Sequence, residues 1–344
     1  MSVAIQQELH DPYPTRLDHA IAPIERLEPS VWGNVDSGPL RARDLDAFSA
    51  RGYLIRPDTV GDDALPPLRR ELERLAAELG DDDPRVIREP GGSIRSIFQP
   101  HLLSELVAAV VRLDTVLPIA RQLLGSDVYI HQARINMMPA FTGTGFYWHS
   151  DFETWHAEDG MPQMRAVSCS IALTRNYPYN GSLMAIPGSH RTFYPCVGAT
   201  PDNHHSSSLV AQQFGVPDEN ALTKAVDGDG IEQFTGAAGS ALWFDCNLLH
   251  GSGSNITPLP RSNVFLVFNS VHNQLAEPYA AAGVRPEYLA ARHTRSLGDA
   301  VPSAQSCRQQ RAACDLGWAL CNGSSAPRSN TASPRRRTPR PIRS

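Results

Sequence analysis

The chain has 344 residues, 41% of them hydrophobic and 19% charged, which is typical of a globular protein with a sizeable core. Its net charge of -5 gives no reason to expect a nucleic acid as a partner. Residues 1–16 lack the basic start and apolar stretch of a signal peptide, and no apolar run approaches the roughly 20 residues that cross a membrane. We therefore expect a cytoplasmic protein without a membrane partner.

The first third of the chain predicts irregular structure followed by helices. Residues 1–40 are interrupted by prolines and are expected to wrap around a core. Residues 44–51 and 65–79 are predicted to be helices, the second because Leu65, Leu68, Leu72, Leu75 and Leu79 recur at nearly helical spacing. Residues 102–124 predict one or two more helices, ending at Gly125.

From Val128 onward the pattern changes to short apolar or alternating runs separated by Gly, Pro and Asn. The predicted strands are residues 128–137, 167–173, 182–186, 241–244 and 263–268. This pattern favours a mainly β fold with flanking helices, built on a double-stranded β-helix, or jelly-roll, core of the cupin type. Residues 200–235 are polar and are expected to form a long, functional or mobile insertion between strands.

The last part of the chain differs in composition. Residues 1–298 are predicted to form a single domain, and residues 299–344 a disordered basic tail rich in Ser, Pro and Arg. A non-functional extension is the simpler interpretation, and a basic arm that touches an acidic partner is the alternative. The six cysteines form no Cys-x-x-Cys pair; Cys169, Cys196 and Cys246 fit reduced cytosolic thiols, while Cys307, Cys314 and Cys321 fall in the tail.

A His-x-Asp pair, His149 and Asp151, stands in the aromatic segment 146–156. Residues i and i+2 of a strand point to one face, so both side chains are expected to bind one ion. His250 is the best candidate for a third ligand on a distant strand. Two histidines and one carboxylate are the ligands of non-haem Fe(II) sites that leave positions open for a co-substrate and O2. An isolated His-x-Asp is more often a surface pair, and the distant His and the β-rich context favour the metal site.

Arg261 follows eleven residues after His250 and is expected to bind the far carboxylate of a 2-oxo acid co-substrate in a bidentate manner. Ser252 adds a hydroxyl donor. An ordinary surface arginine after a proline is the alternative for Arg261. His156, His190, His204 and His205 are expected to be structural or exposed rather than ligands.

The segment 146–162, Phe-Tyr-Trp-His-Ser-Asp-Phe-Glu-Thr-Trp-His-Ala-Glu-Asp-Gly-Met-Pro, closely resembles the signature of the ectoine hydroxylase family, within the phytanoyl-CoA dioxygenase-like group of Fe(II)- and 2-oxoglutarate-dependent oxygenases. The resemblance covers about residues 10–295. Its further matching stretches are residues 13–16, 31–33, 94–96, 132–136, 187–190 and 285–288.

The resemblance implies hydroxylation of ectoine to 5-hydroxyectoine, with succinate and CO2 as co-products, in the synthesis of a compatible solute for osmotic and thermal stress protection. It also implies Fe(II) as the metal, with 2-oxoglutarate and O2 as co-substrates, and a possible homodimer. The residues it assigns are the iron ligands His149, Asp151 and His250, the co-substrate residues Arg261, Ser252, Asn136, Phe146 and Met138, and the substrate residues Gln132, Trp155, Phe244 and Phe265.

The pocket chemistry fits ectoine, a cyclic amidinium that carries a carboxylate. The delocalised cation can stack on Trp155, and Phe244 and Phe265 can enclose it, although strand phenylalanines are more often core. Arg134 or Arg285 is expected to meet the carboxylate of ectoine. Met138 departs from the family, whose members often carry a Lys there, and a thioether cannot replace an ammonium as a donor. Either Arg261 suffices, or co-substrate affinity is reduced.

Three alternatives stay open at this point. One is a related oxygenase that acts on another small, amino-acid-like substrate. Another is a cupin-like metal-binding protein without oxygenase activity, against which Arg261 argues. The third is an enzyme impaired by its tail or by Met138.

Overall fold

The computed structural model describes residues 11–298, apart from residues 81, 211 and 213. The predicted basic tail, with its three cysteines, lies outside the described residues. No helix among the described residues is long and apolar enough to cross a membrane.

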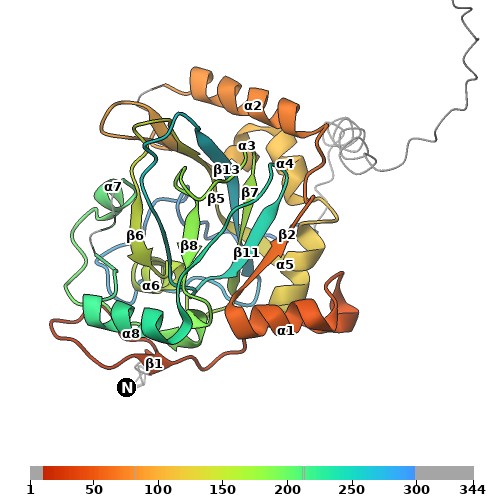
Figure 1. Ribbon diagram of the computed structural model, residues 1–344. Coiled ribbons are helices and arrows are strands. Elements are labelled where there is room, and N and C mark those ends of the chain that lie inside the picture. The colour runs from red at the N-terminus through yellow and green to blue at the C-terminus, as the bar shows by residue number, and fades with distance from the viewer. Residues whose placement is uncertain (1–10, 81, 211, 213, 299–344) are drawn as a thin grey trace, which may run out of the picture.

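Two antiparallel sheets face each other and form a jelly roll (Figure 1). The larger sheet has seven strands in the order β2-β11-β7-β13-β5-β4-β3, and the smaller has four in the order β10-β8-β12-β6. The strands of the larger sheet are β2 (Tyr53–Arg56), β3 (Val86–Arg88), β4 (Ile94–Phe98), β5 (Val128–Met138), β7 (Ala166–Ala172), β11 (Ala241–Asp245) and β13 (Arg261–Ser270). Those of the smaller are β6 (Phe146–His149), β8 (Leu183–Ala185), β10 (Glu232–Gln233) and β12 (His250–Ser252). A two-stranded sheet joins β1 (Ile24–Glu25) to β9 (Thr192–Phe193).

The helices flank this sandwich. They are α1 (Ala42–Arg51), α2 (Leu65–Glu78), α3 (Pro100–Leu103), α4 (Glu105–Val111), α5 (Leu117–Leu124), α6 (Asp151–Thr154), α7 (His205–Ser208) and α8 (Glu219–Asp229), with short turns η1 (Val35–Ser37), η2 (Trp155–Asp159) and η3 (Ser189–Arg191). In Figure 1, α4 and α5 lie on the side of the larger sheet away from β6 and β8. Apolar side chains of α2, α4 and α5 pack there against β5, β7 and β13 in one core cluster. A second, more aromatic cluster fills the space between the sheets.

The predicted strands are all present, with bounds within three residues of the expected ones. Residues 102–124 form parts of three helices instead of one or two, because Ser104 caps α4 and Pro118 lies in the first turn of α5. The insertion 200–235 contains α7, α8 and β10. Asp218 accepts hydrogen bonds from the first backbone amides of α8, a start signal that the sequence analysis missed.

A β-bulge at His131 controls which side chains of β5 face the site. Ile130 pairs with Phe268 and Gln132 with Val267, so His131 has no partner residue on β13. The bulge changes the alternation of the strand. Before it, Val128 and Ile130 join the helix-side core; after it, Ala133 and Ile135 do so, and Arg134, Asn136 and Met138 point into the sandwich.

Candidate active site

His149, Asp151 and His250 form the one cluster of three potential metal ligands in the part of the chain that the structure describes. Their ligand atoms all lie within 4.8 Å of one another. The Nε2 atom of His149 is 3.6 Å from Oδ1 of Asp151, and Nε2 of His250 is 3.9 Å from Oδ2. All three side chains are buried, and the two imidazole rings are 4.2 Å apart between centroids.

The local structure that brings the first two residues together differs from the prediction. His149 is the last residue of β6, Ser150 caps a helix, and Asp151 is the first residue of α6. The expectation that both residues share one strand face is therefore wrong. Ser150 Oγ accepts a hydrogen bond from the backbone N–H of Glu153, and this cap ends the strand. His250 opens β12, directly opposite His149 in the antiparallel register.

Hydrogen bonds and burial prepare these side chains for a cation. Nδ1 of His149 lies 2.8 Å from the carbonyl of Tyr147, and Nδ1 of His250 lies 2.9 Å from that of Leu248, so each Nε2 is left for a ligand. Burial and the nearby His149 lower the pKa of His250 to about 4, so His250 is neutral at pH 7. Burial raises the pKa of Asp151, but the two histidines and Arg134 more than offset this and lower it to about 2. Two imidazoles and one carboxylate fit a divalent transition metal such as Fe(II).

An open cleft of about 750 Å³ contains the two histidines of this cluster. The predicted co-substrate residues all line it: Asn136, Met138, Phe146, Ser252 and Arg261. Arg134 and Phe265, predicted for the substrate, line it as well.

Three register pairs of β5 and β13 form the floor of the cleft. Arg261 is opposite Met138, Asn263 is opposite Asn136, and Phe265 is opposite Arg134. Because alternate residues of a strand share a face, these pairs form three successive rungs along the inner side of the sheet. The guanidinium of Arg134 stacks on Phe265, 4.4 Å from the ring centroid.

The side chain of Arg261 forms no ion pair or hydrogen bond with any described residue, and its Nε atom is buried. Burial and the charge of Arg95 lower the pKa of Arg261 to about 10, which leaves the guanidinium charged at neutral pH. A buried cation without a counter-ion is costly unless a ligand supplies the negative charge. The far end of the cleft is thus suited to a carboxylate.

Aromatic side chains form the wall next to the metal cluster. The ring of Phe244 is 4.9 Å from that of His250 and 5.7 Å from that of Phe265, between centroids. Trp155 opens η2, a π-helical turn directly after α6, and is almost fully buried in the same cluster of side chains. Phe244 is thus both barrel core and a neighbour of the metal ligand His250, whereas Trp155 is placed in the core.

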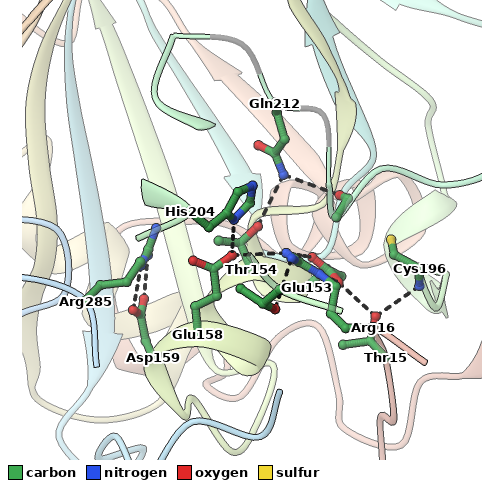
Figure 2. Close-up of polar contacts among 12 residues, drawn as sticks. Thr15, Arg16, Glu153, Thr154, Glu158, Asp159, Cys196, His204, Gln212 and Arg285 are labelled. Carbon is green, nitrogen blue, oxygen red and sulfur yellow. Dashed lines mark hydrogen bonds and ion pairs between the residues drawn. The ribbon is translucent and has the colours of Figure 1, made fainter. Parts of the chain in front are cut away.

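Two predicted substrate residues are already engaged. The amide of Gln132 donates to the carbonyl of Leu289 at 2.8 Å and accepts from Arg134 at 3.1 Å. Arg285 forms a bidentate ion pair with Asp159 (Figure 2), with Nε–Oδ1 and Nη2–Oδ2 distances of 2.7 Å and 2.6 Å. The role of Arg285 toward the carboxylate of ectoine stays a prediction, and only the donors that Asp159 leaves unused are available for it.

Sequence reasoning missed a polar residue that lines the cleft and two buried carboxylates on the π-helical turn. Arg95 lines it, stacks over Phe146 and is held by Glu89 and Thr144. Asp159 and Glu158 end the π-helical turn in a buried network of charges (Figure 2). The sequence did contain a signal for the buried charges, the pair Glu158-Asp159 close to the His-x-Asp motif. Carboxylates that are buried in an apolar segment need cationic partners.

The four other histidines that the sequence analysis considered lie outside the cluster of three potential metal ligands. His156 is buried and stacks on Tyr279, with ring centroids 4.0 Å apart, and His190 is buried next to Ser49. His204 is buried and lies 2.7 Å from Glu158. His205 begins α7 and is partly buried.

Comparison with known proteins agrees with this geometry. The family described as phytanoyl-CoA dioxygenase matches residues 48–263. An ectoine dioxygenase of Nocardia farcinica is 58% identical over 284 residues, which cover 82% of this chain and 94% of that protein.

Two solved structures are similar to the chain over most of its length. One is EctD from S. alaskensis with 2-oxoglutarate and 5-hydroxyectoine, at 42% identity and a TM-score of 0.75, covering 83% of this chain and 96% of that one. The other is EctD from S. alaskensis with bound Fe, at 42% identity and a TM-score of 0.73, covering 83% and 97%. The chain therefore belongs to the phytanoyl-CoA dioxygenase family and, within it, to the ectoine dioxygenases.

Proposed function

We propose that this chain is an Fe(II)- and 2-oxoglutarate-dependent dioxygenase that hydroxylates ectoine to 5-hydroxyectoine, with succinate and CO2 as co-products. The observation that carries the proposal is the cluster of His149, Asp151 and His250 at a cleft that also holds the unpaired Arg261. A metal-binding protein without oxygenase activity has no need for such a cation. The similarity to ectoine dioxygenases supports the choice of substrate.

The metal ligands are Nε2 of His149, Nε2 of His250 and the carboxylate of Asp151. Bound Fe(II), together with 2-oxoglutarate and O2, supplies the oxidising chemistry, and the protein contributes binding, orientation and exclusion of water. Backbone carbonyls fix the two imidazole rings, so each Nε2 lone pair is directed toward the same point. A carboxylate ligand at position 151 occupies the place that a halide would need and favours hydroxylation.

The co-substrate lies along the floor of the cleft, with its distal carboxylate at Arg261. The guanidinium plane provides two parallel donors for that carboxylate, and Ser252 and Asn136 provide further polar contacts. Phe146 covers this half from β6. Met138 faces Arg261 across the register and adds no charge, so Arg261 is the principal cation for this group.

The substrate lies on the other side of the metal, against Trp155, Phe244 and Phe265. Aromatic faces attract the delocalised amidinium of ectoine and exclude water from it. Gln132 orients Arg134 through the hydrogen bond between their side chains. Arg134 and Arg285 are the cations available to the carboxylate of ectoine.

We also propose that residues 1–298 form the catalytic domain of a cytoplasmic protein. A cytoplasmic location is supported by Cys169, Cys196 and Cys246, which are free and buried. A homodimer stays a prediction, to be checked by light scattering of the full chain.

The deciding experiment is anaerobic reconstitution with Fe(II) and 2-oxoglutarate, followed by exposure to O2 with and without ectoine. Mass spectrometry should find ectoine-dependent succinate matched by equal 5-hydroxyectoine. Succinate without 5-hydroxyectoine would contradict the substrate and keep the reaction class. Absence of both products from protein with stoichiometric iron would contradict the enzyme.

A further inference from the structure

Asp159 is a fully buried carboxylate that does not touch the metal cleft. It ends the π-helical turn that Trp155 begins, and its exposed fraction is 0%. A buried carboxylate that stays ionised needs cationic partners. Burial raises the pKa of Asp159, but the charge and hydrogen bonds of Arg285, with a smaller effect of the nearby His131, outweigh this and lower it. Asp159 is therefore an anion at neutral pH.

The carboxylate of Asp159 determines how the guanidinium of Arg285 lies. It receives Nε and Nη2 of Arg285 at 2.7 Å and 2.6 Å, which fixes both the position and the plane of the group (Figure 2). Nη1 of Arg285 forms no hydrogen bond with any residue that the structure describes. One edge of the guanidinium is thus held by Asp159, and the other remains available for an acceptor.

Arg285 is electrostatically close to the metal cluster. Burial lowers its pKa, while Asp159 and, more weakly, Glu158 and Asp151 raise it above its ordinary value. Arg285 also contributes to the lowered pKa of Arg134, after the larger effect of burial. Arg285 is thus near enough to Asp151 and Arg134 to influence their charges, although its direct partner is Asp159.

The carboxylate of Asp159 also lies next to His131, which contacts Trp155. Nε2 of His131, the residue of the β-bulge, is 3.4 Å from Oδ2 of Asp159. The ring of His131 meets that of Trp155 edge to face, with centroids 5.1 Å apart. Asp159 therefore contacts the arginine directly and is linked to the tryptophan through one imidazole.

We propose that Asp159 is a positioning residue of the substrate pocket: it holds Arg285 so that Nη1 is directed at the carboxylate of ectoine. It also offsets the charge of Arg285, so this half of the site matches a zwitterion instead of a second dianion. The inference rests on the proposed function, because it assumes that the substrate is ectoine.

A purely structural role for Asp159 gives a different expectation. Backbone hydrogen bonds already join this turn to the C-terminal segment, from Ala276 to Gly160 at 2.8 Å and from Ala280 to Ala157 at 2.9 Å. Arg292 also donates to the backbone carbonyl of Asp159 at 2.9 Å. None of these contacts uses the Asp159 side chain, so Asp159→Asn should fold.

The test compares Asp159→Asn with the matched control Asp245→Asn in the full chain. Asp245 forms a comparably buried ion pair with Arg26 at 2.8 Å, and neither residue lines the metal cleft. We expect Asp159→Asn to raise the KM for ectoine about tenfold or more and to change the KM for 2-oxoglutarate less than about twofold. Anaerobic calorimetry with ectoine, on protein loaded with Fe(II) and 2-oxoglutarate, should show the same rise in Kd. Asp159→Glu keeps the charge and should recover part of the affinity.

The outcomes separate this inference from the proposed function. A wild-type protein that makes no 5-hydroxyectoine overturns the proposed function and this inference with it. A wild-type protein that makes it, beside an Asp159→Asn variant with unchanged KM and Kd for ectoine, overturns the inference alone. Equal losses of ectoine affinity and melting temperature in Asp159→Asn and Asp245→Asn would also overturn it, because they indicate a structural role only.

Discussion

The proposed co-substrate and substrate halves of the site each have a buried arginine, and the two charges are balanced differently. Arg261, which lines the cleft, has no carboxylate partner among the described residues, whereas Arg285, proposed for the substrate, is held by Asp159 on one edge of its guanidinium. A lone buried cation is stabilised only when a ligand brings net negative charge, as a dicarboxylate does. A cation that is already paired retains donors without excess charge and so suits a ligand that is itself neutral overall. The difference indicates that the pocket distinguishes its two organic ligands by net charge.

The walls follow the same division. Polar side chains of Asn136 and Ser252 line the cleft with Arg261, while Phe244, Phe265 and Trp155, which we propose for the substrate, belong to one aromatic core cluster. Carboxylate oxygens need hydrogen-bond donors, and a delocalised amidinium prefers aromatic faces. Substitutions in one half should therefore change the affinity for one ligand and leave the other nearly unchanged.

Asp151→Ala should have the largest effect, because both halves depend on the metal between them. We expect loss of 5-hydroxyectoine formation on the order of a thousandfold or more, with reduced iron content after desalting. The measurements are product formation by mass spectrometry and iron by atomic absorption. Wild-type turnover in this variant would refute the ligand assignment, and the exposed Asp18→Ala serves as control.

Arg261→Gln tests the co-substrate half. It removes the unpaired charge and shortens the side chain while keeping a polar amide, so the KM for 2-oxoglutarate should rise about a hundredfold. The KM for ectoine should stay within about threefold of wild type, since the change is distant from the aromatic wall. Steady-state kinetics with either ligand varied would show this, and an equal rise in both KM values would contradict the division of the cleft.

Trp155→Leu tests the substrate half. The substitution keeps an apolar side chain but removes the face on which the amidinium stacks, so the KM for ectoine should rise about tenfold. The KM for 2-oxoglutarate should hardly change. A larger effect on 2-oxoglutarate than on ectoine would place Trp155 on the wrong side of the metal.

Met138→Lys should have the smallest effect. Met138 faces Arg261 in the register, and its side chain packs close to Gly143 and Gly181. An ammonium there would add a second cation near the co-substrate, and we expect the KM for 2-oxoglutarate to fall about two- to threefold. Isothermal titration of 2-oxoglutarate would measure it directly. A weaker affinity would indicate that the glycine-lined space cannot direct a Lys side chain toward the cleft.

The main strands and the three candidate metal ligands could be predicted from the sequence, because apolar alternation and the His-x-Asp pair are local signals. The sequence did not predict how Asp151 is placed: the strand ends at His149, and the capping residue Ser150 puts Asp151 at the start of a helix. It also missed the pairing of Arg285 with Asp159, which joins residues that are 126 positions apart. Long-range partners of buried charges depend on the packing of the whole chain, and no local pattern encodes them.

The bulge at His131 has a consequence for protein engineering. Along β5, the side chains that face the cleft alternate with Ala133 and Ile135, which belong to the helix-side core. A substitution that enlarges or reshapes the pocket from this strand will therefore disturb the packing of α5 and α4 by moving the same backbone. Variants selected for new substrates at positions 134 and 136 should show correlated changes in thermal tolerance through the helix-side core. Variants of Trp155, on the π-helical turn, leave that core unchanged and should instead alter thermal tolerance through the aromatic cluster between the sheets.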